Sequence, residues 1–179
     1  MEPKILVIYK STTGFTKRYA QMLSKEVACT LAPYKSATPE LMSAYETVVF
    51  GSRAHAGRID GYPRIKEMYK KSSARKFALF VTGAMPAAAE DTISAFWAQN
   101  LPGNELQKVP HFYLPGGLCY EKMPFADRLM MKAAMAMVKK KKHKTAEDLE
   151  MEQAMASSYD ISDPAYLKPL VSLLKKAGG

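Results

Sequence analysis

Two patterns of apolar and polar positions alternate along this chain. Short, continuous apolar runs are the first pattern, and residues 5–9 (ILVIY) form the earliest of them. Longer segments with an apolar residue every three or four positions are the second. The segment behind the first run shows this spacing at Tyr19, Met22, Leu23 and Val27. Short apolar runs predict buried strands, and the helical spacing predicts an amphipathic helix with one apolar face.

The alternation continues to the end of the chain. We expect further strands at residues 29–34, 46–52, 76–82 and 109–114. We expect further helices at residues 38–44, 62–71 and 90–98, and a last helix from Asp163 to Ala177. Strands that alternate with helices in this way predict an α/β fold, a doubly wound parallel sheet with helices on both faces. Of the two common strand orders, 2-1-3-4-5 suits these strands.

In a sheet of that order, ligands bind at the carboxyl ends of the strands, at the point where the strand order reverses. The loops after the first, third and fourth strands should therefore converge. These loops are residues 11–16, 51–58 and 82–86. We expect the functional site to form where they meet.

The first of these loops is rich in hydroxyl side chains. Residues 11–16 read Ser-Thr-Thr-Gly-Phe-Thr and precede a helix, whose N-terminal N–H groups and positive dipole end attract anions. A helix cap needs one hydroxyl, whereas this loop has four. It contains no lysine or arginine, so it favours a phosphate held by neutral hydrogen bonds. Its spacing differs from the glycine patterns of dinucleotide folds and nucleotide triphosphatases.

The third-strand loop is basic, and neither it nor the first loop has carboxylates where the strands end. A receiver domain shares the predicted topology but needs carboxylates for its magnesium ion, so this class is excluded. Arg53, His55 and Arg58 put positive charge at the expected site. They are either solvated loop cations or neighbours of the bound ligand.

Composition sets further limits on the class of protein. A chain of 179 residues with 47% hydrophobic residues suits a single domain, residues 1–179, and no apolar run is long enough to span a membrane. The first strand begins too close to Met1 for a signal peptide, so we expect a cytoplasmic location. Cys29 and Cys119 are isolated and the three histidines are scattered, which predicts no metal site.

The charge is concentrated after the fifth strand. The chain has a net charge of +9, and residues 121–145 hold eight basic residues but only two acidic ones, Glu121 and Asp127. Methionines alternate with these cations, which predicts an inserted, basic, Met-rich helix within residues 119–150. Its lysines either face water, or bind an anionic membrane surface at about 1 kcal/mol per cation, or bind nucleic acid. Only Phe125 adds an aromatic among the cations, so no nucleic acid is expected.

The hydroxyl-rich loop resembles the phosphate loop of flavodoxins, Ser/Thr-x-Thr-Gly-x-Thr, with Ser11, Thr13, Gly14 and Thr16 at the constrained positions. The resemblance implies a flavodoxin-like fold and FMN as the cofactor. It implies that the phosphate is held by Ser11, Thr12, Thr13, Gly14, Phe15 and Thr16. It implies that the ring lies next to Ser52, Arg53, Ala54, His55, Thr82 and Gly83. A cation that reaches the N1–C2=O edge of the ring would then raise the two-electron potential.

A narrower resemblance concerns the insert. Residues 118–132 are similar to the segment after strand five of bacterial quinone-dependent protoporphyrinogen oxidases, which are membrane-associated flavodoxin-fold enzymes. This implies an oxidoreductase that acts on a porphyrinogen or quinone and contacts the inner face of the membrane through residues 122–144. However, residues 145–162 are longer and more acidic than expected for that class. A non-catalytic flavodoxin-type electron carrier or FMN-dependent interaction module is the alternative. No catalytic side chain is identified.

Overall fold

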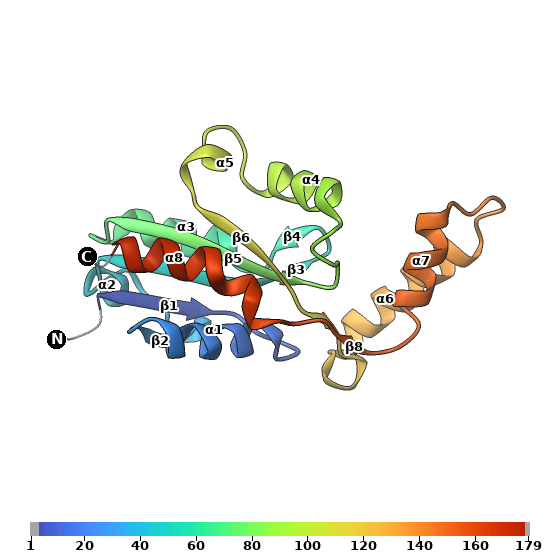
Figure 1. Ribbon diagram of the computed structural model, residues 1–179, viewed down its shortest axis with the longest axis horizontal. Coiled ribbons are helices and arrows are strands. Elements are labelled where there is room, and N and C mark those ends of the chain that lie inside the picture. Colours follow the sequence, from blue (N-terminus) through green and yellow to red (C-terminus); the bar gives the residue numbers. More distant parts are fainter. Residues whose placement is uncertain (1–3, 178–179) are drawn as a thin grey trace.

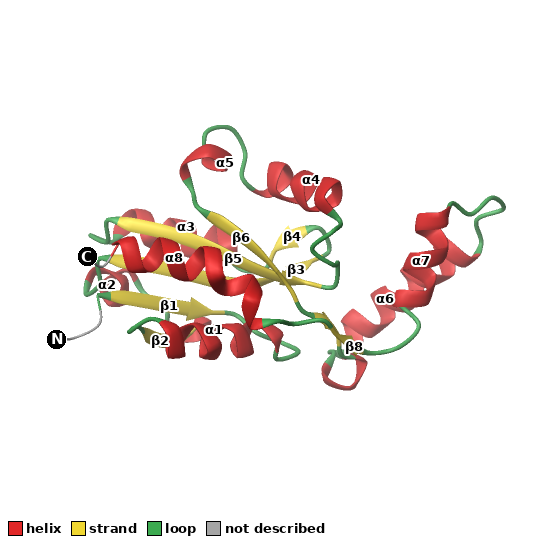
Figure 2. Cartoon of the chain, in the orientation of Figure 1, coloured by secondary structure: helices red, strands yellow, loops and turns green. Residues whose placement is uncertain are grey.

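The core of the molecule is a parallel sheet with helices on both faces (Figures 1 and 2). The computed structural model describes residues 4–177, apart from the side chains of Glu147 and Ala177. The parallel strands lie in the order β2 (Thr30–Pro33), β1 (Ile5–Tyr9), β3 (Thr47–His55), β5 (Lys76–Gly83) and β6 (His111–Pro115). The short β4 (Arg58–Ile59) pairs antiparallel with β3. Counted without β4, this is the predicted 2-1-3-4-5 order, which is confirmed.

Each face of the sheet has its own layer of helices. These are α1 (Phe15–Glu26), α2 (Pro39–Ser43), α3 (Tyr62–Lys71), α4 (Glu90–Asn100) and α8 (Lys168–Ala177). The apolar residues of α1 and α8 pack on one face with Val7, and those of α2, α3 and α4 pack on the other with Leu6. Consecutive strand residues point to opposite faces, so a strand covered on both sides needs apolar residues throughout. This explains the continuous apolar run of β1.

Short helices complete the part of the molecule around the parallel sheet, which we call the body. They are η1 (Tyr34–Ser36), α5 (Glu105–Lys108) and η3 (Pro164–Leu167), the last of which leads directly into α8. The Asp163 carboxylate accepts a hydrogen bond from Ala165 N at 2.7 Å and caps η3. The predicted start of the last helix at Asp163 is therefore a capped 3₁₀ turn, and the α-helix proper begins at Lys168.

The third strand is longer than predicted, because it continues past residue 52 to His55, so the predicted loop at residues 51–58 is wrong for residues 53–55. Residues 51–55 continue β3, and the chain then turns back through Ala56 and Gly57 into β4. Both turn residues have positive φ, 48° and 75°, as a tight hairpin turn requires. The hairpin forms because Ile59 is buried in the core and its N–H donates to Asn100 Oδ1 at 2.9 Å.

Between β6 and α8 the chain leaves the body and returns. We call residues 117–160, from β7 (Gly117–Leu118) to β8 (Tyr159–Asp160), the excursion. β7 and β8 form a two-stranded antiparallel ribbon at the base of the excursion. Beyond it lie η2 (Tyr120–Lys122), α6 (Phe125–Lys139) and α7 (Ala146–Ala154). We call α6 and α7 the helical hairpin; it projects from the end of the body (Figure 1). No described helix is long and apolar enough to cross a membrane.

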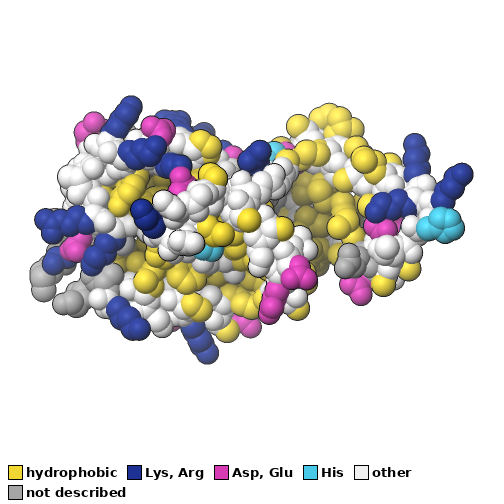
Figure 3. Space-filling model, turned by 90° about the horizontal axis from the view of Figure 1, so that it is seen from above, with side chains coloured by type: hydrophobic (Ala, Val, Ile, Leu, Met, Phe, Trp, Pro, Cys, Tyr) yellow, Lys and Arg dark blue, Asp and Glu magenta, His cyan; other side chains and the backbone are white. Residues whose placement is uncertain are grey.

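The helical hairpin carries apolar side chains without covering them. No residue of α6, all of which the structure describes, is buried, and Phe125, Leu129 and Met137 are 78%, 58% and 73% exposed. Figure 3 shows hydrophobic side chains gathered on the hairpin, with basic side chains at its far end. The apolar residues of α6 therefore do not contribute to the core in the way that those of α8 do.

We expect Leu170→Ala to lower the free energy of unfolding by about 2–5 kcal/mol, because Leu170 is fully buried between α8 and the sheet. Leu129→Ala, on the exposed side of α6, should change it by no more than about 0.5 kcal/mol. Urea unfolding followed by circular dichroism measures both. A large loss for Leu129→Ala would show that α6 packs against the body, contrary to the structure.

Candidate functional site

A cavity of 140 Å³ lies at the carboxyl ends of the parallel strands, where the strand order reverses. The body contributes Thr13, Phe15, Arg53, Ala54, His55, Ala56, Thr82, Gly83 and Ala84. The excursion contributes Gly117, Leu118, Cys119, Met123, Asp127, Met130 and Met131. The predicted convergence of the loops after β1, β3 and β5 is therefore present, and one wall of the cavity comes from a part of the chain that the strand pattern did not place there.

The loop after β1 leaves the start of α1 open to an anion. Gly14 is the N-cap residue with φ 103°, a conformation that favours glycine, and no described side chain caps the helix. The Ser11 hydroxyl oxygen is buried and has no hydrogen-bond partner among the described residues. Buried hydroxyls without a partner are rare in native structures, so this hydroxyl fits a donor to a bound anion. Thr13 lines the cavity, and Thr12 is exposed.

Thr16 and Ser52, two of the predicted site residues, hold the loops together instead of lining the cavity. The Thr16 hydroxyl is 2.8 Å from the Thr82 hydroxyl, which in turn donates to the Ser52 carbonyl at 3.3 Å. Thr82 has one hydroxyl proton and donates it to the Ser52 carbonyl, so Thr16 is the donor in the first bond. The Thr16 hydroxyl proton is therefore not available to a ligand. The Ser52 hydroxyl donates to the Asp60 carbonyl at 2.5 Å. Thr16 therefore offers an anion its backbone N–H, in the first turn of α1.

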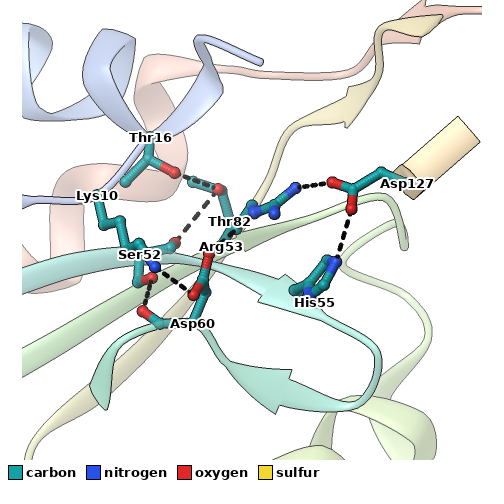
Figure 4. A network of polar contacts seen from close by, with 8 residues as sticks. All are labelled: Lys10, Thr16, Ser52, Arg53, His55, Asp60, Thr82 and Asp127. Carbon is teal, nitrogen blue, oxygen red and sulfur yellow. Dashed lines mark hydrogen bonds and ion pairs between the residues drawn. The ribbon is translucent and has the colours of Figure 1, made fainter. Parts of the chain in front are cut away.

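A chain of ion pairs crosses the site from β1 to the helical hairpin (Figure 4). Lys10 Nζ donates to Asp60 Oδ1 at 2.5 Å, and Arg53 Nε donates to Asp60 Oδ2 at 3.2 Å. Arg53 Nη1 also donates to Asp127 Oδ2 at 2.7 Å, and His55 Nε2 lies 3.0 Å from Asp127 Oδ1. We call these five residues the ion-pair network. It joins the end of β1, the β3–β4 hairpin and the first turn of α6.

The network keeps both carboxylates ionised. Burial raises the pKa of Asp60, but the hydrogen bonds and charges of Lys10 and Arg53 outweigh it, so the pKa lies below its usual value. Burial likewise opposes ionisation of Asp127, and Arg53 with His55 outweighs it to lower that pKa. With two carboxylates beside it, Arg53 is not a solvated loop cation. The positive charge expected from Arg53 is thus compensated, while Arg58 is exposed.

Sequence reasoning missed Asp60, Asp127 and the methionines of the cavity wall. Asp127 did carry a signal, because it is one of only two acidic residues within the basic segment 121–145. An acidic residue surrounded by lysines is a candidate for a specific ion pair. No such signal marks Met123, Met130 and Met131, since methionines at helical spacing are typical of any buried helix face.

The structure offers no site for a metal ion among the residues that it describes. No group of three or more histidine, cysteine, aspartate or glutamate side chains comes together in residues 4–177. Cys29 and Cys119 are both free.

Comparison with known proteins gave one family and a set of similar folds. Residues 6–145 match the flavodoxin domain family. No curated protein matches the chain. Similar solved structures include a flavodoxin from the domain Archaea, with 15% identity, 74% of this chain and 96% of that chain covered, and a TM-score of 0.40. The two-electron reduced flavodoxin of Megasphaera elsdenii has 12% identity, 68% and 89% coverage, and a TM-score of 0.44. A flavoprotein of Lactobacillus acidophilus NCFM in complex with FMN has 13% identity, 63% and 92% coverage, and a TM-score of 0.43.

We expect Asp60→Asn to lower the free energy of unfolding by about 1–2 kcal/mol at pH 7, because it removes the charge that pairs with Lys10 and Arg53. The folded pKa of Asp60 is depressed. Its contribution is therefore complete above the unfolded pKa of about 3.9 and is lost as the pH falls through the folded pKa. The difference between the proteins should narrow below about pH 4.

Urea unfolding at pH 7 and pH 3 measures this difference. Glu67→Gln is the matched control, since Glu67 pairs with Lys70 on the exposed side of α3. Surface pairs of this kind contribute little, so no measurable change is expected. A gap between Asp60→Asn and the wild type that is as large at pH 3 as at pH 7 would contradict the account.

Proposed function

The chain belongs to the flavodoxin domain family, and on that premise we propose that it is an FMN-binding flavoprotein that transfers electrons. FMN in flavodoxin-type folds binds where the strand order reverses between β1 and β3, which is where the cavity lies here. We treat residues 1–179 as one flavodoxin-like domain and residues 119–150 as an insertion in it.

The observation that carries this proposal is that the unpartnered Ser11 hydroxyl and the uncapped start of α1 occur together. A buried hydroxyl without a partner and a helix N-terminus without a side-chain cap lie in the same short loop. Both are donors, and both fit the oxygens of a phosphate. Ser11, Thr12, Thr13 and Gly14, with the backbone N–H groups of Phe15 and Thr16, would hold the phosphate.

The ring would lie toward the cavity, beside residues 52–55 and 82–83. When bound, FMN supplies the electron-accepting and electron-donating chemistry. The protein orients it and sets its electrostatic surroundings. Arg53 is held by Asp60 and Asp127, so its guanidinium has a fixed position next to the cavity. His55 is held in the same way by Asp127. No side chain of the site is assigned a role as acid, base or nucleophile.

The surface of the helical hairpin indicates what kind of partner the protein would bind. Its exposed apolar side chains and the lysines at the end of α6 together suit an anionic membrane surface. Met123, Met130 and Met131 of the same excursion line the cavity, so the surface that would meet the membrane borders the proposed flavin site. We therefore propose an oxidoreductase at the inner face of the membrane, acting on a quinone or porphyrinogen. The second candidate is a non-catalytic carrier or interaction module whose basic hairpin docks on an acidic protein.

We expect the purified protein to show the visible absorbance of bound FMN, with acid-released FMN identified by chromatography. Ser11→Ala should weaken FMN binding about tenfold, because it removes one hydrogen bond to a charged group. The apoprotein should lose no stability, since the Ser11 hydroxyl has no partner to lose. Titration of apoprotein with FMN and urea unfolding measure the two effects.

Ser24→Ala is the matched control for this substitution. Ser24 lies on exposed α1 surface and its hydroxyl donates to the Gln21 carbonyl, away from the cavity. It should leave FMN affinity unchanged. A colourless protein that cannot be reconstituted with FMN would refute the proposed function, and equal affinities for Ser11→Ala and wild type would refute the role of Ser11.

Replacing Lys139, Lys140 and Lys142 with glutamine should weaken binding to vesicles containing phosphatidylserine about 100-fold at low salt, at about 1 kcal/mol per cation. No hydrogen bond or ion pair joins the side chains of these three lysines to another described residue. Lys25, Lys35 and Lys175 are exposed on the body and form the matched triple control. Sedimentation with vesicles measures the affinity. Equal losses for both triple variants would show nonspecific charge attraction, and no vesicle binding by the wild type would favour the carrier.

A further inference from the structure

We propose that Lys122, a residue of the excursion, binds the phosphate of the cofactor and supplies the countercharge that the phosphate loop lacks. This inference rests on the proposed function. The loop at residues 11–16 contains no lysine or arginine, so a phosphate held by the loop alone would face only neutral donors. The positive charge comes from a residue far away in the sequence.

The position of the Lys122 ammonium group is the first observation. A Cβ atom placed on Gly14 would lie 3.9 Å from Lys122 Nζ, and no other described atom outside residues 13–15 lies within 4 Å of it. Gly14 is the N-cap residue of α1 and has the positive φ described above. The ammonium group therefore lies against the turn of the loop that presents the N–H groups of α1.

The second observation is that the Lys122 ammonium group is available to a ligand. None of the hydrogen bonds and ion pairs among the described residues involves the Lys122 side chain, which is exposed. The other cations of the site are already paired: Lys10 with Asp60, and Arg53 with Asp60 and Asp127. The neighbouring carboxylate of Glu121 accepts from Ser158 at 2.8 Å. A backbone hydrogen bond, followed by the bond from Ser158, lowers the pKa of Glu121. Lys122 is thus an unpaired cation that lies against this loop.

Hydrogen bonds and packing hold the backbone on both sides of Lys122 in place, so the fold positions this lysine beside the loop. Lys122 N donates to the Cys119 carbonyl at 3.3 Å in η2. The next residue, Met123, is 8% exposed and lines the cavity. On the far side, Asp127 is tied to Arg53 and His55. The segment is therefore fixed on both sides of Lys122, and only the side chain has freedom.

These features suit a phosphate monoester as the ligand. A lysine acts as a compact point charge, suited to a phosphate that already receives hydrogen bonds from a helix N-terminus. Riboflavin has the ring of FMN without the phosphate, so it separates this contact from contacts to the ring. Because Lys122 belongs to the excursion, phosphate binding would also join the excursion to the phosphate loop.

The test compares FMN and riboflavin affinities of Lys122→Gln, Lys122→Arg and wild type, by titration of apoprotein. We expect FMN to bind Lys122→Gln about tenfold more weakly, as for the loss of one charge-assisted hydrogen bond, while riboflavin affinity stays unchanged. Lys122→Arg should recover most of the FMN affinity. Inorganic phosphate should compete with FMN, and less well in Lys122→Gln. Lys139→Gln is the matched control: it removes the same charge from the far end of α6 and should leave both affinities as in wild type.

The outcomes separate this inference from the proposed function. If the wild type binds FMN and Lys122→Gln binds it equally well, the inference is overturned while the proposed function stands. Equal weakening of FMN and riboflavin would assign Lys122 a structural role and also overturn it. If the wild type binds neither flavin, the proposed function fails and the inference fails with it. Hydrogen exchange at residues 120–122, slowed by FMN but not by riboflavin in the wild type, is the expected second readout.

Discussion

The reversal of strand order at β1 is the constraint on which the rest of the structure depends. β1 pairs with β2 on one side and β3 on the other, and Leu6, Val7 and Ile8 are fully buried. The chain that leaves β1 enters α1 on one face, whereas the chain that leaves β3 enters α3 on the other. Because the connections depart to opposite faces, a crevice opens at the carboxyl ends of these strands. The cavity occupies that crevice.

Charge around the crevice is balanced by pairs instead of being left free. Asp60 lies between Lys10 and Arg53, and Arg53 lies between Asp60 and Asp127. Partly buried charges are costly unless they are paired, which explains why the cations and carboxylates alternate. The network also has a mechanical role, because it connects β1, the β3–β4 hairpin and α6. β1 and β3 already pair in the sheet, so what the ion pairs add is the connection from the β3–β4 hairpin to α6.

The body and the helical hairpin differ in how far their apolar side chains are buried. The body buries its apolar side chains in two layers around the sheet. The helical hairpin leaves Phe125, Leu129 and Met137 exposed and concentrates lysines at its far end. An isolated helical hairpin gains little from packing on itself, so its place is set at its base, by the β7–β8 ribbon and by Asp127. The cavity wall that it provides depends on those few contacts.

The sequence by itself determined the main strands and helices of the sheet, their order along the chain and the loops that converge at the cavity. Apolar spacing is a local property, so the strand of β1, the helix at residues 62–71 and the hydroxyl-rich loop could be predicted without any contact. The extension of β3 through residues 53–55 could not, because Arg53 pairs with Thr82 of β5 and residues 54–55 pair with β4, contacts between segments far apart or folded back in the chain.

Only the tertiary structure decided that Asp127 meets Arg53 and His55, that the Thr16 hydroxyl is taken by Thr82, and that Lys122 lies beside Gly14. These contacts join residues far apart in the chain. No periodicity or motif specifies how the excursion folds back onto the crevice, since that orientation results from the ribbon and the ion pairs together.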